Sequence, residues 1–243
     1  MQQAAAPVGP AGRAAAWLGG ALFVTSLAYF LYCYGVRFAR GRGGAAGSSA
    51  EIARAILVNL ALFSAFALHH SIMARSGAKR WLTRHVPQAL ERSTYVWVAS
   101  VLFLATCFWW QHIPGLVYEV RGPWRVAGWA VQAVGVWLAL DGARAIDLLD
   151  LAGVRQTTGR ASSGTLQARG AYGLVRHPIY LGWTLLVFGT PVMTGTRLSF
   201  ALISTLYLVV AIPFEERSLV ESFGDEYVRY QRHVRWRMVP GLY

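Results

Sequence analysis

The chain has 243 residues, of which 55% are hydrophobic and 14% charged, and its formal net charge is +12. This composition excludes an ordinary soluble domain, because soluble domains contain about 25% charged residues. Ten tryptophans and eleven tyrosines, whose rings gather at the headgroup level of bilayers, further indicate an integral membrane protein.

Four apolar stretches are long enough to cross a hydrocarbon core, which takes roughly 20 residues per helix. In chain order they are residues 14–38, 55–73, 95–113 and 126–146. A further apolar region, residues 179–214, is too long for one helix and is interrupted by GTPVMTGTR, so it predicts a tight hairpin of two short helices. The sequence therefore predicts an all-α polytopic membrane protein with about six transmembrane segments.

The basic residues fall mainly between these segments. With six spans and a cytoplasmic amino terminus, most of the 23 Lys and Arg residues lie on the cytoplasmic side, in agreement with the positive-inside rule. We therefore expect both termini in the cytoplasm, and a bilayer rather than nucleic acid as the partner of the positive charge. Residues 1–243 are expected to form one domain, with four spans in residues 1–150 and a linker, the hairpin and a tail in residues 151–243. The oligomeric state is not indicated, because lipid-facing and partner-facing helix surfaces are both apolar.

Polar residues gather at the two ends of the predicted hairpin. The segment RHPIY, which starts at Arg176, precedes the first helix, and Glu215 and Glu216 follow the apolar part of the second. Because a helical hairpin returns to the side of the membrane from which it started, we expect these two groups to meet on the cytoplasmic side.

The chemistry of these groups indicates a charged ligand. Arg176 offers a planar fork to a carboxylate, and His177 and Tyr180, three residues apart, share one face of a helix. The amides ahead of the proline are expected to stay free for a ligand, and Glu215 and Glu216 favour a cation. S-adenosylmethionine, with a carboxylate, an ammonium and a sulfonium, suits this set. Each motif alone is also typical of the end of a membrane helix, where arginine snorkels and glutamate is solvated.

Two groups of motifs resemble known families. RHPIYLGW, the apolar hairpin and EERSLVESFGDEYVRYQRHV resemble the carboxyl-terminal signature of the isoprenylcysteine carboxyl methyltransferase and phospholipid methyltransferase superfamily, whose members use S-adenosylmethionine in the membrane. Upstream, YFLYCYG, HHSIMAR, KRWLTRHVPQALERSTYV and DLLDLAGVRQ are similar to pieces of bacterial methanethiol S-methyltransferases, which make dimethyl sulfide, and of NnrU-type proteins. The resemblance implies a methyltransferase of the bacterial inner membrane that acts on a small lipophilic thiol.

Residue chemistry and resemblance together predict the cofactor-binding residues. The resemblance implies that backbone of the linker lies over S-adenosylmethionine and that side chains from both hairpin ends contact it. The predicted set is Thr165, Leu166, Gln167, Tyr172, Arg176, His177, Tyr180, Glu215 and Glu216.

A thiol acceptor must lose its proton, because the thiolate is the nucleophile. The candidates for a base or a neighbouring cation are His70 in ALHHSIMAR and Arg92 in ERSTY. His70 is equally consistent with a hydrogen-bonded packing residue, and Arg92 with an interfacial ion pair or a helix start. Methyl transfer of this kind needs no metal, and the sequence shows no metal-binding pattern of cysteines.

Three alternatives stay open on the sequence alone. The acceptor can be the carboxylate of an isoprenylcysteine or another lipophilic molecule. A haem-binding electron carrier would instead need facing histidines in neighbouring helices, and a non-catalytic membrane protein would leave RHPIY and EE as boundary markers.

Overall fold

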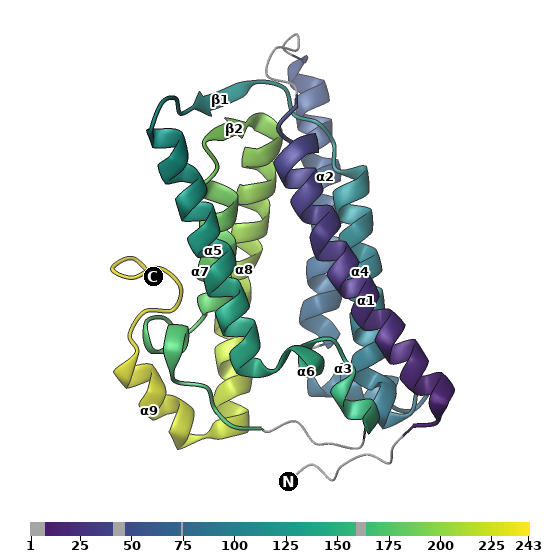
Figure 1. Ribbon diagram of the computed structural model, residues 1–243. Helices are drawn as coiled ribbons and strands as arrows, with labels where there is room; N and C mark the ends of the chain where they lie inside the picture. Colours follow the sequence, from purple (N-terminus) through teal and green to yellow (C-terminus); the bar gives the residue numbers. More distant parts are fainter. Residues whose placement is uncertain (1–7, 41–46, 74, 159–163) are drawn as a thin grey trace. The chain divides into compact units, whose positions relative to one another are not determined.

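The computed structural model describes residues 8–40, 47–73, 75–158 and 164–243 (Figure 1). Helices dominate these residues and the two strands are short, which confirms the predicted all-α class. The longer elements are α1 (Pro10–Tyr32), a π-helix (Cys33–Arg37), α2 (Ser49–Met73), α4 (Glu91–Trp109), α5 (Trp124–Ile146), α7 (Pro178–Phe188), α8 (Gly195–Phe223) and α9 (Asp225–His233). The shorter ones are α3 (Ser76–Leu82), α6 (Leu148–Leu151), β1 (Leu116–Glu119), β2 (Val192–Thr194) and the 3-10 turns Gln88–Leu90, Arg155–Thr158 and Gly170–Gly173.

Among the described residues, four helices are long and apolar enough to cross a membrane, namely Pro10–Arg37, Ser49–Met73, Trp124–Ile146 and Gly195–Phe223. Their outer faces carry large apolar side chains. Trp17, Leu57 and Leu206 are 58%, 66% and 60% exposed, an arrangement that suits contact with lipid. Helix α7 has 11 residues, about 16 Å of helix, so it is too short to cross a membrane as a helix by itself.

The hairpin was predicted to consist of two short helices, which is correct for α7 and wrong for α8. Helix α8 has 29 residues and continues past Pro213 and both glutamates to Phe223. The charged residues after Phe214 end the apolar run without ending the helix, because Glu, Arg and Leu are all good helix formers. Gly224, with φ of 55°, then turns the chain into α9.

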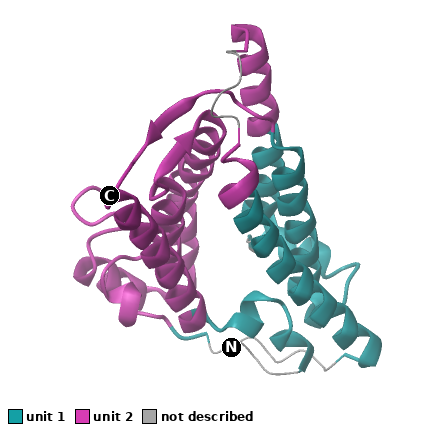
Figure 2. Ribbon diagram, turned by 45° about the horizontal axis from the view of Figure 1, so that its top comes forward, with its two compact units in different colours: residues 1–33, 61–110, 146–165 teal, residues 34–60, 111–145, 166–243 magenta. Residues whose placement is uncertain are grey.

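The chain divides into two compact units (Figure 2). Unit 1 consists of Met1–Cys33, Ala61–Trp110 and Ile146–Thr165, and unit 2 consists of Tyr34–Leu60, Gln111–Ala145 and Leu166–Tyr243. Unit 1 is organised by α1 lying along α4.

The contact between α1 and α4 depends on small residues. A Cβ on Gly19 would stand 2.8 Å from the ring of Trp97, so only glycine admits this ring. Trp97 Nε1 donates to the carbonyl of Ala15 at 2.9 Å, and the rings of Phe30 and Phe103 lie 5.7 Å apart. These contacts fix one face of α4 against α1.

In unit 2, glycines allow α5 and α7 to pack closely. Two of them, Gly135 and Gly142, lie seven residues apart on α5. A Cβ on Gly135 would stand 2.6 Å from the carbonyl oxygen of Gly182, and a Cβ on Gly182 would stand 2.5 Å from that of Gly135. Nearer the start of α7, a Cβ on Gly142 would stand 2.8 Å from the side chain of Ile179. Residues seven positions apart lie on nearly the same face of a helix. The contacts of Gly135 and Gly142 therefore show that α5 lies along α7 up to the RHPIY segment.

The turn of the hairpin is extended rather than helical. Strand β2 pairs antiparallel with β1. Arg197, only 6% exposed, donates to the carbonyls of Tyr34, Gly35 and Val192 at 2.9, 3.0 and 2.6 Å. Irregular backbone in a membrane protein needs such partners from the protein itself, so β1 and Arg197 together make the short α7 possible.

Candidate functional site at the ends of the hairpin

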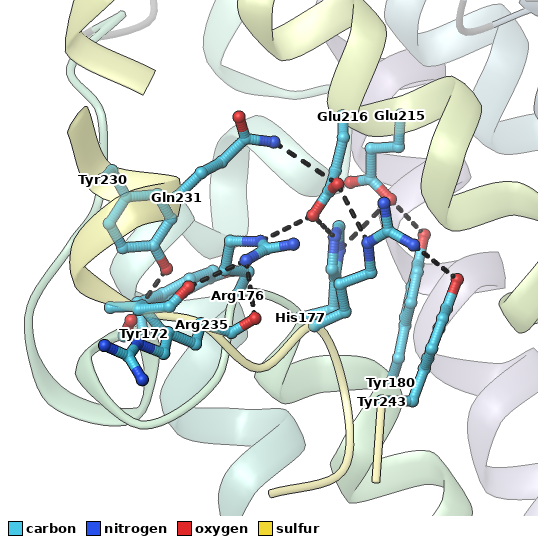
Figure 3. A network of polar contacts seen from close by, with 12 residues as sticks. Tyr172, Arg176, His177, Tyr180, Glu215, Glu216, Tyr230, Gln231, Arg235 and Tyr243 are labelled. Carbon is cyan, nitrogen blue, oxygen red and sulfur yellow. Dashed lines mark hydrogen bonds and ion pairs between the residues drawn. The ribbon is translucent and has the colours of Figure 1, made fainter. Parts of the chain in front are cut away.

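The two ends of the hairpin meet in unit 2 (Figure 3). Arg176 Nε donates to Glu216 Oε1 at 2.6 Å, and the Tyr180 hydroxyl donates to Glu215 Oε2 at 2.7 Å. The meeting of RHPIY with the paired glutamates, predicted from the hairpin pattern, is therefore confirmed.

The segment ahead of α7 is held by the carboxyl-terminal tail, which we define as residues 224–243, after α8. Pro178 occupies the first turn of α7, as predicted. The backbone N–H groups of Arg176 and His177, however, donate to the carbonyls of Trp236 and Arg237 at 2.9 and 2.8 Å. The prediction that these amides stay free for a ligand is therefore wrong, because the tail supplies backbone acceptors that the sequence pattern does not reveal.

Arg176 is buried between Glu216 and the tail. Its side chain is 7% exposed, and Nη1 donates to the carbonyls of Val234 and Arg235 at 2.8 and 2.9 Å. A buried ion pair is stable only if further hydrogen bonds satisfy its remaining groups, and the tail provides them. Two of the three guanidinium nitrogens therefore hold protein groups, and a contact of Arg176 with a ligand's carboxylate stays a prediction.

Glu216 has a second cationic partner. Its Oε2 accepts from Arg237 Nε at 3.2 Å and from Gln231 Nε2 at 3.4 Å, and its side chain is 6% exposed. Burial lowers the pKa of Arg237, but the Glu216 carboxylate and the Tyr243 hydroxyl together outweigh burial and the net pKa is raised. The Glu216 carboxylate thus lies between two guanidinium groups, and this pairing ties α8 to the tail.

His177 and Tyr180 form a stacked pair beside Glu215. Their ring centroids lie 5.3 Å apart with an interplanar angle of 12°. His177 Nδ1 lies 3.5 Å from Glu215 Oε2, and Nε2 lies 3.5 Å from Glu216 Oε1, beyond a well-formed hydrogen bond. Within the described part of the chain, Nε2 is buried without a hydrogen-bond partner. Glu215, by contrast, has a side chain that is 43% exposed, so it is the carboxylate that a ligand can reach.

The linker before α7 closes one flank of this cluster. The Tyr230 hydroxyl donates to the carbonyl of Tyr172 at 2.7 Å, and Leu166 packs against the cluster formed by Tyr227, Tyr230 and Val234. Burial, followed by the charge of Glu215, raises the pKa of Tyr172 well above its usual range. Leu166 and Tyr172 are therefore placed by packing on the tail.

The remaining linker residues of the predicted set are Thr165, which is exposed, and Gln167, which is half-buried. Thr165 belongs to unit 1 and Gln167 to unit 2. Residues 159–163 of the predicted linker lie outside the described residues.

The two predicted catalytic residues lie in unit 1, whereas the predicted cofactor residues, Thr165 excepted, lie in unit 2. His70 Nδ1 lies 2.5 Å from the hydroxyl of Tyr95, whose ring stacks on His69 at 5.8 Å. Arg92 Nε donates to the carbonyl of Asp150 at 2.7 Å. Arg92 therefore helps to hold α6 against α4, while His70 and Tyr95 form a hydrogen-bonded pair.

Two charged residues of the cluster were not singled out from the sequence. Arg237 is one of several tail arginines, and no sequence signal separates it from the others. Asp141 did carry a signal, because a carboxylate within an apolar segment is a functional candidate. Asp141 Oδ2 accepts the backbone N–H of Ala171 at 3.3 Å, and the next residue, Gly142, accepts from the Tyr172 hydroxyl at 3.5 Å. Asp141 therefore lies beside the linker that flanks the cluster.

The region that contains α5, the hairpin and the start of α9 matches a known family. The family model described as "Phospholipid methyltransferase" matches residues 124–226. The "Methanethiol S-methyltransferase" of Mycobacterium tuberculosis is 43% identical to the chain over 192 residues, covering 76% of this chain and 79% of that protein. The "Methanethiol S-methyltransferase 2" of Bradyrhizobium diazoefficiens is 40% identical over 205 residues, covering 81% and 78%. "Nurim" of Rattus norvegicus is 28% identical, covering 68% and 70%. No solved structure matches the chain.

Proposed function

The chain belongs to the phospholipid methyltransferase family, and from this premise we propose that it transfers the methyl group of S-adenosylmethionine to methanethiol, giving dimethyl sulfide. The choice of acceptor rests on relatives named methanethiol S-methyltransferases that are 35% to 43% identical to the chain over the aligned residues. Family membership also favours an enzyme over the haem carrier and the non-catalytic membrane protein considered from the sequence.

One observation carries the position of the donor site. Inside the region matched by the family model, His177 is 5% exposed, and its Nε2 has no hydrogen-bond partner among the described residues. A buried polar atom of this kind costs free energy unless a partner arrives. S-adenosylmethionine fits such a place, because its carboxylate can accept from His177 and its ammonium can pair with Glu215. We assign Tyr172, Tyr180 and residues 165–167 to the walls of the same site.

The reaction needs little chemistry from the protein. The thiolate sulfur attacks the methyl carbon in line with the carbon–sulfur bond of the sulfonium, that bond breaks, and the donor leaves as a neutral thioether. The negative charge of the thiolate and the positive charge of the sulfonium neutralise each other in this step, so orientation and exclusion of water are the main requirements. The protein must also supply a place for the thiol proton.

We propose His70 as the group that accepts this proton. The Tyr95 hydroxyl lies 2.5 Å from Nδ1 and 3.4 Å from Nε2 of His70, so Nε2 is the less engaged nitrogen and the one proposed to receive a proton when Nδ1 carries the other one. Arg92 is the alternative, as a cation that stabilises the thiolate. Its Nε is held by the carbonyl of Asp150, so its contribution would come from the other guanidinium nitrogens.

The test is a headspace assay on the purified full-length protein. Protein in detergent, methanethiol and S-adenosylmethionine with a deuterated methyl group should yield labelled dimethyl sulfide, detected by gas chromatography with mass spectrometry. Parallel reactions with an isoprenylcysteine and with phosphatidylethanolamine test the other acceptor classes. Transfer of label to one of these acceptors in place of methanethiol would reject the proposed substrate, and no transfer to any of them would reject the proposed activity.

We further propose that the protein resides in a bacterial inner membrane with both termini in the cytoplasm. The support is the excess of Lys and Arg in the segments that this orientation places inside. A carboxyl-terminal alkaline phosphatase fusion should be inactive and a green fluorescent protein fusion bright. The reverse pattern would contradict the orientation.

A further inference from the structure

The cluster at the hairpin ends has an unbalanced charge. Among the described residues, the guanidinium groups that contact its carboxylates are those of Arg176 and Arg237, and both contact Glu216. Glu215 contacts only His177 and Tyr180 among the described residues. Glu216 is therefore neutralised by its own partners, and Glu215 is not.

Asp141 is a second carboxylate without a cationic partner among the described residues. Its only polar contact there is with the backbone N–H of Ala171, at 3.3 Å. The close approach of Gly142 to Pro178 and Ile179, where a Cβ would stand 3.4 and 2.8 Å from their side chains, brings this part of α5 to the start of α7. Asp141 therefore lies beside the linker that flanks the cluster, near the start of α7.

The Tyr172 hydroxyl is close enough to both carboxylates to feel their charges. Its hydroxyl donates to the carbonyl of Gly142, next to Asp141, at 3.5 Å. After burial, the charges of Glu215 and Asp141 both raise the pKa of Tyr172, which places its hydroxyl within the field of both. The two guanidinium groups that contact Glu216 and the three carboxylates sum to one negative charge.

The proposed reaction changes the charge of the molecule bound there. S-adenosylmethionine has a carboxylate, an ammonium and a sulfonium and is a net cation. S-adenosylhomocysteine has lost the sulfonium and is neutral overall. A site with one excess negative charge attracts the first more than the second. The buried Nε2 of His177, which has no hydrogen-bond partner among the described residues, independently indicates that a ligand belongs at this place.

Building on the proposed function, we propose that Asp141 and Glu215 are the specificity-determining residues that distinguish the methyl donor from the spent product by charge. Asp141 is then a donor-site residue in α5, in addition to those of the hairpin. This difference in affinity helps turnover. Once the methyl group is transferred, the product S-adenosylhomocysteine is neutral, so the excess negative charge of the site no longer attracts it and it can leave.

The test is isothermal titration of the full-length protein in detergent with each ligand. Asp141→Asn keeps an acceptor for the Ala171 N–H and removes only the charge, and Glu215→Gln does the same for the Tyr180 hydroxyl. We expect each variant to raise the Kd for S-adenosylmethionine about tenfold and to leave the Kd for S-adenosylhomocysteine within about twofold. Glu226→Gln, an exposed acidic residue in α9, is the matched control and should change neither.

The outcomes separate the two proposals. Equal weakening of both ligands, or no weakening of either, overturns the charge-selection proposal and leaves the methyltransferase proposal intact. A wild-type protein that binds neither ligand overturns both. If Asp141→Asn fails to fold, Glu215→Gln decides, because the Glu215 side chain is 43% exposed.

Discussion

Replacing Glu216 with glutamine should release the carboxyl-terminal tail. Glu216 and Arg176 have side chains that are 6% and 7% exposed, so the substitution leaves a buried guanidinium without its carboxylate. Removing one partner of a buried ion pair costs roughly 3–5 kcal/mol. Because Arg176 also holds the carbonyls of Val234 and Arg235, this cost falls on the docking of the tail. The opening equilibrium of the tail should shift by roughly a hundredfold or more.

Limited trypsin digestion of the protein in detergent, without added donor, measures this opening. Cleavage after Arg235 and Arg237, followed by intact mass, should accelerate in Glu216→Gln in proportion to the open fraction. Glu215→Gln, at a partly exposed neighbouring position, should change the rate by less than about fivefold, since exposed pairs contribute about 1 kcal/mol or less. If the tail of Glu216→Gln is cut no faster than that of the wild type, the structural role assigned to this ion pair is refuted.

Two further predictions concern catalysis and packing. His70→Gln should lower kcat by about 10²–10⁴ with an unchanged Kd for S-adenosylmethionine, and its activity should recover as rising pH ionises the thiol in solution; an unaltered pH profile would argue against a base at this position. Gly182→Ala should destabilise the protein by about 1–3 kcal/mol, because its Cβ would stand 2.5 Å from the carbonyl of Gly135. Thermal unfolding in detergent measures this, with Gly77→Ala, where nothing lies within 4 Å of an added Cβ, as the control.

The parts of the fold that follow from hydrophobic pattern could be predicted from the sequence. The long apolar runs and the interrupted hairpin correspond to α1, α2, α4, α5 and the α7–α8 pair. The length of α8 could not be read from hydropathy, because its last turns are charged and still helical. The pairing of β1 with β2 is also absent from the pattern, since strands of four and three residues are set by the contacts around them.

The candidate site was predictable as a set of residues but not as a set of contacts. The hairpin argument identified Arg176, His177, Tyr180 and the two glutamates, and the structure brings all five together. It also expected Arg176 and the amides beside it to serve a ligand, whereas the tail engages both. Every residue has a backbone carbonyl, so no residue type indicates that the carbonyl of Trp236 will accept a hydrogen bond from the amide of Arg176.

The pair Glu215 and Glu216 shows why adjacent identical residues need a structure to be told apart. Neighbouring positions on a helix point about 100° apart, and here one carboxylate faces two arginines in the interior while the other is 43% exposed beside Tyr180. We expect loss of Glu216 to lower activity by releasing the tail from the proposed donor site, and loss of Glu215 to lower it by weakening binding of the proposed donor. An activity assay alone therefore cannot assign their roles. Protection of the tail from trypsin tests Glu216 as the residue that anchors the tail. The ratio of the affinities for S-adenosylmethionine and S-adenosylhomocysteine tests Glu215 as the residue that contacts the ligand.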